Sequence, residues 1–320
     1  MSWFLFAAVS MLGWGTADLF YKKSSDGTDR YSHLKISVWV GLVMGICAVG
    51  LLPFSESLMS GGNILSGMLS YSPASLSYIL SMVIGYAGLR YLELSIVSPV
   101  QNASGAFSAV CIIIYFTVTG RITDIGREFS VLDLIGTLLI VIGMILLAIA
   151  EQKLSLPDVR AQSDKKYRYG ALSLIFPLLY CVFDTLGTAA DGIILDCASG
   201  AGLGEIDVII LYGFTFLLFG AGCFIFLAVK EKKIYNPFKR SEAPKAYAAL
   251  CEEFGQIFYV YAMAKNPVIA APMVASYCIV SVLLSRTVLK EKLNVRQYIC
   301  IAAVICGIVL LGISEGLSEA

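Results

Sequence analysis

The sequence predicts an all-α polytopic membrane protein, with ten transmembrane helices arranged as two inverted five-helix repeats. The chain has 320 residues, of which 58% are hydrophobic and only 14% are charged. Ordinary soluble domains carry about 25% charged residues, so this composition excludes a typical soluble enzyme. Apolar segments long enough to cross a bilayer, about 20 residues each, follow one another along the chain. Features of the first half also recur in the second.

Ten segments have the required length and composition, and most connections between them are short, as in antiparallel helix hairpins. The longest polar stretch between segments, Glu151–Tyr169, falls near the middle of the chain. The sequence therefore predicts a first repeat in residues 1–152, a cytoplasmic linker in 153–169 and a second repeat in 170–320. The expected helices are Trp3–Tyr21, Leu34–Phe54, Ser75–Leu94, Ser98–Thr119, Val131–Ala150, Gly170–Ile193, Ile206–Val229, Lys245–Ala264, Val268–Leu289 and Gln297–Ser314.

Lysine and arginine are distributed unevenly between the two sets of loops. Of the 23 cations, 20 lie after the odd-numbered segments, and only Arg121, Arg127 and Lys265 lie on the other side. Because cytoplasmic loops carry the excess of Lys and Arg, both termini are predicted on the non-cytoplasmic side of the plasma membrane. No basic tract typical of nucleic-acid binding is present. The expected partners are the bilayer and a small-molecule substrate, with the chain as a monomer or homodimer.

The cysteine pattern gives no indication of a metal site, a disulfide framework or a cofactor. Nine cysteines lie mostly inside apolar runs, and none forms a CxxC pair. A buried free cysteine usually behaves as a small apolar side chain. We therefore expect no metal and no cofactor.

Two aspartates occupy similar places in the two halves. Asp18 follows Trp14 in the first segment, and Asp184 follows Tyr180 in the sixth, at the same spacing of four residues. In a helix this spacing puts the aromatic ring and the carboxylate on one face. A carboxylate within a membrane segment is costly and usually faces a protein interior or a wet cavity, where it serves a function. Asp18 also lies four residues before Lys22, so a local ion pair is the alternative interpretation for Asp18.

Two further similarities support a duplication. Leu134–Glu151 resembles Tyr298–Glu315 at six positions, and Pro99 and Pro272 each follow a very short connection and are expected to open a helix. Because each half has an odd number of helices, the second half enters the membrane in the opposite direction. Inverted repeats are typical of transporters, whose substrate sites lie near the midplane between the halves.

These features together resemble the drug/metabolite transporter superfamily, specifically its EamA-like ten-helix members. The resemblance rests on the helix count, the glycine-aromatic stretch Leu12–Asp18, the proline-led fourth and ninth helices, and the Gly/Ala-rich fifth and tenth helices. It implies an alternating-access carrier whose central cavity is lined by helices 1, 3, 4, 6, 8 and 9. Helices 5 and 10 would pack outside that core.

Helix 8 carries two adjacent carboxylates, Glu252 and Glu253, which point about 100° apart. We expect Glu252 to face the cavity, because it shares a face with Gln256 and Tyr259. A carboxylate that is desolvated by burial can exchange a proton near neutrality. The candidates for proton coupling are Asp184, Glu252 and Glu253.

Carboxylates beside aromatic rings favour a cationic or zwitterionic amine, choline-like or amino-acid-like, because aromatic faces attract cations. Gln101 and Asn102, which follow Pro99, either line the pore or cap the helix. The expected substrate-binding residues are Trp14, Asp18, Tyr86, Gln101, Asn102, Tyr180, Asp184, Glu252, Gln256 and Tyr259.

Two other functions remain as alternatives. One is export of another metabolite, a nucleobase or a drug by a carrier of the same superfamily. The other is an integral-membrane enzyme of lipid metabolism, since Asp191-Gly192 with Asp196, Glu205 and Asp207 faintly resembles the metal motif of CDP-alcohol phosphotransferases. The Ala-Arg that should follow Asp-Gly in that motif is absent, and no catalytic residue is assigned.

Overall fold

A computed structural model of the chain describes residues 2–25, 29–59, 64–92, 94–161, 175–196, 203–290 and 293–318, and all regular secondary structure within these ranges is helical. Most of the expected segments correspond to helices. The long helices are α1 (Trp3–Ser24), α2 (Ser32–Leu51), α4 (Ile64–Gly88), α8 (Val131–Ala161), α9 (Ile175–Ile194), α10 (Glu205–Glu231), α11 (Ala243–Lys265) and α14 (Val295–Ser318). The shorter ones are α3 (Glu56–Met59), α5 (Leu94–Asn102), α6 (Ser104–Val118), α7 (Ile125–Glu128), α12 (Pro267–Ala275) and α13 (Cys278–Leu284).

Seven helical stretches among the described residues are long and apolar enough to cross a membrane, which makes this a multi-pass membrane protein. They are Trp3–Ser24, Ser32–Phe54, Ile64–Gly88, Val97–Val118, Glu205–Glu231, Pro267–Leu289 and Val295–Ser318. Helices α9 and α11 are more polar because each carries two buried or half-buried carboxylates, Asp184 and Asp191 on α9 and Glu252 and Glu253 on α11.

The third helix begins earlier than the sequence predicts. Helix α4 starts at Ile64 rather than Ser75, and Pro73 lies inside it. A proline removes the N–H that would bond to the carbonyl four residues before it. The hydroxyl of Ser72 donates to that carbonyl, on Leu69, at 2.7 Å. The local hydroxyl explains why the helix continues through the proline, as is common in membrane helices.

Pro99 and Pro272 also lie inside helices, so the prediction that each opens a helix is wrong. Pro99 belongs to α5 and Pro272 to α12. Each helix is interrupted four residues after its proline, at Ala103 and at Ser276. The side chain of Asn102 donates to the carbonyl oxygen of Ser98 at 2.8 Å, next to the first interruption. The two breaks therefore occur at matching places in the two halves.

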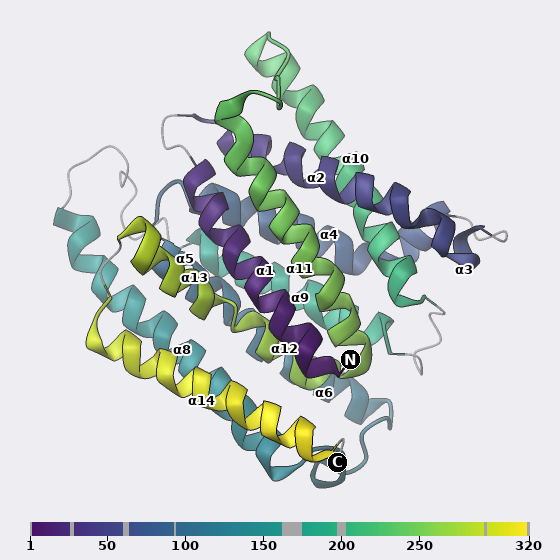
Figure 1. The fold of residues 1–320 in the computed structure, drawn as a ribbon, viewed down its shortest axis with the longest axis vertical. Coiled ribbons are helices and arrows are strands. Elements are labelled where there is room, and N and C mark those ends of the chain that lie inside the picture. The colour runs from purple at the N-terminus through teal and green to yellow at the C-terminus, as the bar shows by residue number, and fades with distance from the viewer. Residues whose placement is uncertain are drawn as a thin grey trace.

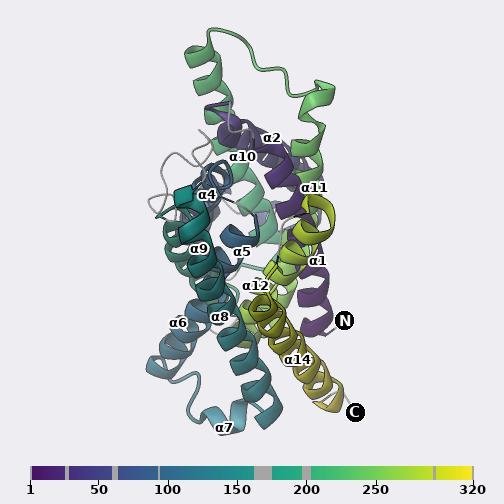
Figure 2. The same cartoon turned by 90° about the vertical axis from the view of Figure 1, so that its left-hand side faces the viewer.

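Each main helix contact joins a helix of the first half to one of the second. Helix α1 packs on α11, α4 on α9, α2 on α10, α6 on α12, and α8 on α14. Figure 1 shows α8 and α14 side by side along one edge of the bundle, outside the helices that surround its centre. Both termini lie toward the same end, as Figures 1 and 2 show.

Candidate functional site

A cavity with an empty volume of about 720 Å³ lies between the two halves. The walls come from α1, α4, α5, α6, α9, α10, α11, α12 and the break before α13. Its lining residues are Trp14, Asp18, Tyr21, Tyr78, Met82, Gly85, Tyr86, Leu89, Gln101, Asn102, Gly105, Tyr180, Asp184, Thr188, Tyr212, Glu252, Gln256, Tyr259, Ala271, Val274, Ala275 and Tyr277.

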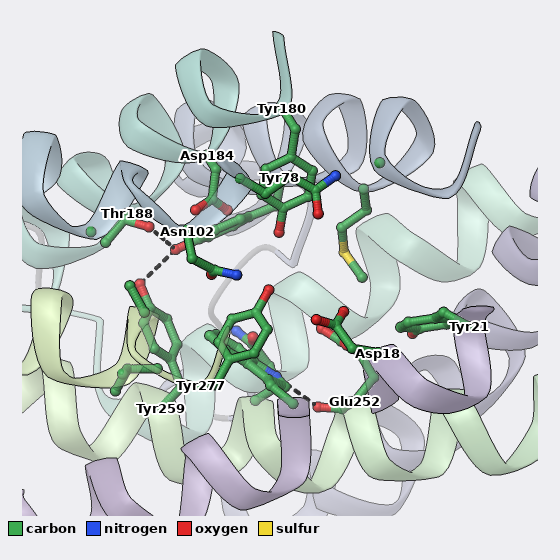
Figure 3. Close-up of a pocket in the computed structure, with 18 of the residues that line it drawn as sticks. Asp18, Tyr21, Tyr78, Asn102, Tyr180, Asp184, Thr188, Glu252, Tyr259 and Tyr277 are labelled. Carbon is green, nitrogen blue, oxygen red and sulfur yellow. Dashed lines mark hydrogen bonds between the residues drawn. The ribbon is translucent and has the colours of Figure 1, made fainter. Parts of the chain in front are cut away.

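The structure brings the ten residues that the sequence indicates for binding to this one cavity (Figure 3). Glu253, the remaining candidate for proton coupling, is buried on α11 but is not among the lining residues, and it faces Cys47 of α2. Of the two adjacent glutamates, Glu252 is thus the one on the cavity wall. Their roles in binding and coupling remain predictions.

Serine hydroxyls hold the two matching aspartates. Asp18 Oδ2 accepts hydrogen bonds from Ser98 and Ser281, both at 2.7 Å. Asp184 Oδ2 accepts one from Ser104 at 2.6 Å. Ser281 lies on α13 and Ser104 on α6, the helices that follow the two breaks, and each belongs to the half opposite its aspartate, so each aspartate is bonded across the interface between the halves.

Lys22, the cation expected beside Asp18, donates to backbone carbonyls. Its ammonium group bonds to the carbonyl oxygen of Leu89 at 2.9 Å and to that of Leu92. These carbonyls follow the C-terminus of α4, where a cation is favourable. Lys22 thereby fixes the end of α1 against the end of α4.

Aromatic rings form much of the cavity wall. The Trp14 ring lies 4.9 Å from that of Tyr259 and 5.6 Å from that of Tyr277, between ring centres. Trp14 Nε1 donates to the backbone carbonyl of Glu252 at 3.2 Å, which fixes the orientation of the indole. Toward the cytoplasmic end of the expected topology, Tyr21 and Tyr86 lie 4.5 Å apart, between ring centres.

Several polar atoms on the wall have no hydrogen-bond partner among the described residues. Buried polar groups are normally paired, so a concentration of unpaired ones indicates a place for water or a ligand. These atoms are Tyr21 Oη, Tyr86 Oη, Gln101 Nε2 and Gln256 Nε2. They supply hydrogen-bonding groups in addition to the carboxylates.

Three hydroxyls bond to one another at one side of the cavity. Tyr78 Oη donates to Thr188 Oγ1 at 3.1 Å and lies 2.5 Å from Tyr259 Oη. This group, which we call the hydroxyl constriction, joins α4, α9 and α11 (Figure 3). Sequence reasoning missed Tyr78 and Thr188, although Thr188 is one turn beyond Asp184 on the same helix face.

The acidic residues that suggested a metal motif go to different partners. Asp191 lies inside α9 and accepts a hydrogen bond from Tyr71 at 2.6 Å. Asp196 pairs with Arg121 at 3.2 Å, and Asp207 accepts from Ser55 at 2.5 Å. Within the part of the chain that the structure describes, these three carboxylates therefore do not share one site.

Comparison with known proteins identifies the second half of the chain. Residues 194–313 match the EamA-like transporter family, so this part of the chain is an EamA-like domain of the drug/metabolite transporter superfamily. The family consists of transporters rather than enzymes. No curated protein matches the chain. A solved structure, titled only "Crystal structure of protein", aligns with a TM-score of 0.56 and 13% identity over 98% of each chain, which shows a shared fold.

Proposed function

We propose that the protein is an alternating-access secondary transporter of a small cationic or zwitterionic amine. The charge of the cavity carries this proposal. Asp18, Asp184 and Glu252 contribute carboxylates, and no lysine or arginine is among the described residues that line the cavity. Buried carboxylates on a wall that carries no cation favour a positively charged ligand, which would compensate their charge.

The aromatic wall supports the same class of ligand. A cation over an aromatic face gains about 0.5–2 kcal/mol, and several rings around one cation recognise substituted ammonium groups. Trp14, Tyr259 and Tyr277 meet at one side of the cavity, within reach of the carboxylates that line the same space. The unpaired amides of Gln101 and Gln256 offer donors for a carboxylate or hydroxyl on the same ligand. This arrangement supports a choline-like or amino-acid-like solute.

The paired helices support transport by two inverted repeats. In the two repeats, α1 corresponds to α9, and α4 corresponds to α11. Exchanging the repeats therefore turns the contact between α1 and α11 into the contact between α9 and α4, and both contacts are present. The pairs α2–α10 and α8–α14 map onto themselves, and α6–α12 maps onto the contact of α13 with α5. This pattern is the one expected of ten spans related by a two-fold axis in the membrane plane, with the site where the halves meet.

A ligand panel on the detergent-purified protein tests the cargo. Choline, amino acids and nucleobases are compared by thermal shift, because a ligand that binds only the folded state raises the melting temperature. We expect an amine to stabilise the wild type and to lose this effect in Asp184→Asn. Uptake or efflux of that amine by proteoliposomes should disappear in the same variant while its folding persists.

Asp196→Asn is the matched control, because Asp196 lies just beyond the same helix and pairs with Arg121 away from the cavity. It should retain binding and transport. Undiminished transport by Asp184→Asn would overturn the proposed site. Stabilisation by nucleobases alone would favour the other cargo class of the superfamily.

A further inference from the structure

Helix α9 carries a polar stripe that continues beyond the cavity. Tyr180, Asp184, Thr188 and Asp191 are spaced by four, four and three residues, which places them on one helix face. The first three line the cavity, whereas Asp191 is 0% exposed and is not among the lining residues. A second carboxylate therefore lies behind the cavity wall, and the proposed cargo site does not use it.

Asp191 is only partly satisfied by its neighbours. Its Oδ1 accepts from Tyr71 Oη at 2.6 Å, but its Oδ2 has no hydrogen-bond partner among the described residues. The titratable groups that face it are phenols and one other carboxyl group, none of which is positively charged. They are Tyr71 and Tyr78 of α4, Tyr212 of α10, Tyr259 of α11, and Asp184 of α9.

The hydroxyl constriction accounts for the missing partner. Tyr78 donates its single hydroxyl proton to Thr188, so the short contact between Tyr78 and Tyr259 is donated by Tyr259. Both phenol protons are then used within the constriction, while Tyr78 and Tyr259 also face Asp191. A proton on Asp191 Oδ2 would instead donate to the oxygen of a facing phenol. Without that proton, a buried negative charge would lie beside phenols and a second carboxyl group, with no cation among the groups that act on it to compensate the charge.

We propose that Asp191 is a proton-binding site behind the hydroxyl constriction, and that its protonation keeps this end of the cavity closed. The O–H bond forms on Oδ2 with a proton from solvent, and it breaks when the proton returns to solvent as this end opens. No other bond changes. The proposal rests on the proposed function only in treating closure as a step of transport.

Asp191 lies close to the turn from α11 into α12, so opening of the bundle at this end would expose it to solvent. Next to Asp191, a side chain added at Gly192 would meet Pro267, the first residue of α12. Because the closed state binds the proton more tightly than the open state, proton loss and opening are linked. Raising the pH should therefore favour the open state at this end.

Infrared difference spectroscopy of the purified protein tests the site directly. We expect the carbonyl band of a protonated carboxylic acid at neutral pH, lost in Asp191→Asn. In Tyr71→Phe the band should shift to higher frequency, because the carbonyl loses its hydrogen bond. Asp207→Asn, which removes another buried carboxyl group that Ser55 already satisfies, should keep the band. Identical bands in wild type and Asp191→Asn would overturn the proposal.

Thiol labelling tests the link to opening. A cysteine at Ala271, which lines the cavity on α12, reports access from this end. The rate of labelling of Ala271→Cys should increase with pH, by more than the ionisation of the thiol alone explains. Adding the Asp191→Asn substitution should abolish this excess and leave only the pH dependence of the thiol itself. Equal pH profiles in the two backgrounds would contradict the proposal. Loss of the infrared band on adding NaCl at constant pH would assign a sodium site instead. Neither measurement needs the cargo, so its outcome is independent of the transport assay.

Discussion

At the scale of single residues, Trp14 connects the binding wall to the helix that carries Glu252. Its ring faces the cavity beside Tyr259, and its N–H bonds to a backbone carbonyl. These two roles can be separated by substitution. Trp14→Phe keeps an aromatic face but removes the donor, whereas Trp14→Ala removes both.

We expect Trp14→Ala to weaken binding of the amine selected by the ligand panel by about 2- to 30-fold, from the 0.5–2 kcal/mol typical of a cation–aromatic contact. Trp14→Phe should lose less. Titration calorimetry measures both affinities. Trp39→Phe is the control, because Trp39 packs on Phe238 rather than on the cavity. Unchanged affinity of Trp14→Ala would remove the indole from the site.

The sequence predicts the carboxylates of the cavity better than its hydroxyls. Asp18 and Asp184 stand out because a charge in an apolar helix is costly, and Glu252 for the same reason. Tyrosine gives no such signal, since it also packs in cores and at membrane interfaces. Tyr212 lies on a largely apolar helix, where nothing in the sequence separates a cavity-facing ring from a packed one. The sequence points to Asp191 only through the metal-like motif, although Asp191 lies seven residues beyond Asp184 on the same helix face.

At the scale of helices, glycine sets how closely α1 and α11 approach. A side chain added at Gly13 would meet the backbone of Gly255 at 2.9 Å. One added at Gly255 would lie against the Trp14 ring. Small residues of this kind allow membrane helices to pack backbone to backbone. The indole therefore depends on the absence of a side chain at Gly255.

Gly255→Ala should lower stability by about 1–3 kcal/mol, as overpacking of a close contact usually does, and should weaken amine binding through displacement of Trp14. Thermal unfolding in detergent measures the first effect, and calorimetry the second. The control is Gly222→Ala on α10, where an added side chain meets nothing within 4 Å. That change should be neutral or slightly stabilising, since alanine favours the helix. Equal melting temperatures for the two variants would contradict the packing argument.

The positions of helix ends and breaks could not be predicted from the sequence. Pro73, Pro99 and Pro272 each suggest a boundary, yet each lies inside a helix. Whether a proline ends a helix depends on what satisfies the freed carbonyl, and at Pro73 that group is the hydroxyl of Ser72. In α5 and α12 the regular helix instead breaks four residues later. Such compensation is local and three-dimensional, so the periodicity of apolar residues does not reveal it.

At the scale of the whole molecule, the expected topology predicts that the basic loops face the cytoplasm. Both termini lie toward the same end of the bundle, as an even number of membrane passes requires (Figure 2). Reporter fusions at either terminus should therefore be active only on the non-cytoplasmic side, and a fusion in the loop after Glu231 only inside. A cytoplasmic signal from both termini would reverse the orientation of the carrier in the membrane.

The exchange of the two halves also relates the two ends of the cavity. The hydroxyl constriction uses α4, α9 and α11, and its counterpart under the exchange uses α11, α1 and α4. That counterpart contains Tyr86, Tyr21 and Glu252, where the two phenol oxygens have no partner among the described residues. One end is thus joined by short hydrogen bonds between hydroxyls, while at the other the Tyr21 and Tyr86 rings pack against each other beside Glu252. In a carrier built from inverted repeats, the closed arrangement moves from one end of the cavity to the other when the protein changes state.

Tyr78→Phe should therefore shift the molecule toward opening at the constriction. The change removes the hydroxyl shared by Thr188 and Tyr259, and two neutral hydrogen bonds contribute about 2 kcal/mol together, or about 30-fold in population. Labelling of Ala271→Cys measures this access, with the parent protein giving the background of native cysteines. Tyr86→Phe removes an equivalent but unpaired hydroxyl and should leave labelling unchanged. If both phenylalanine variants label alike, the hydrogen bonds do not control the closure of this end.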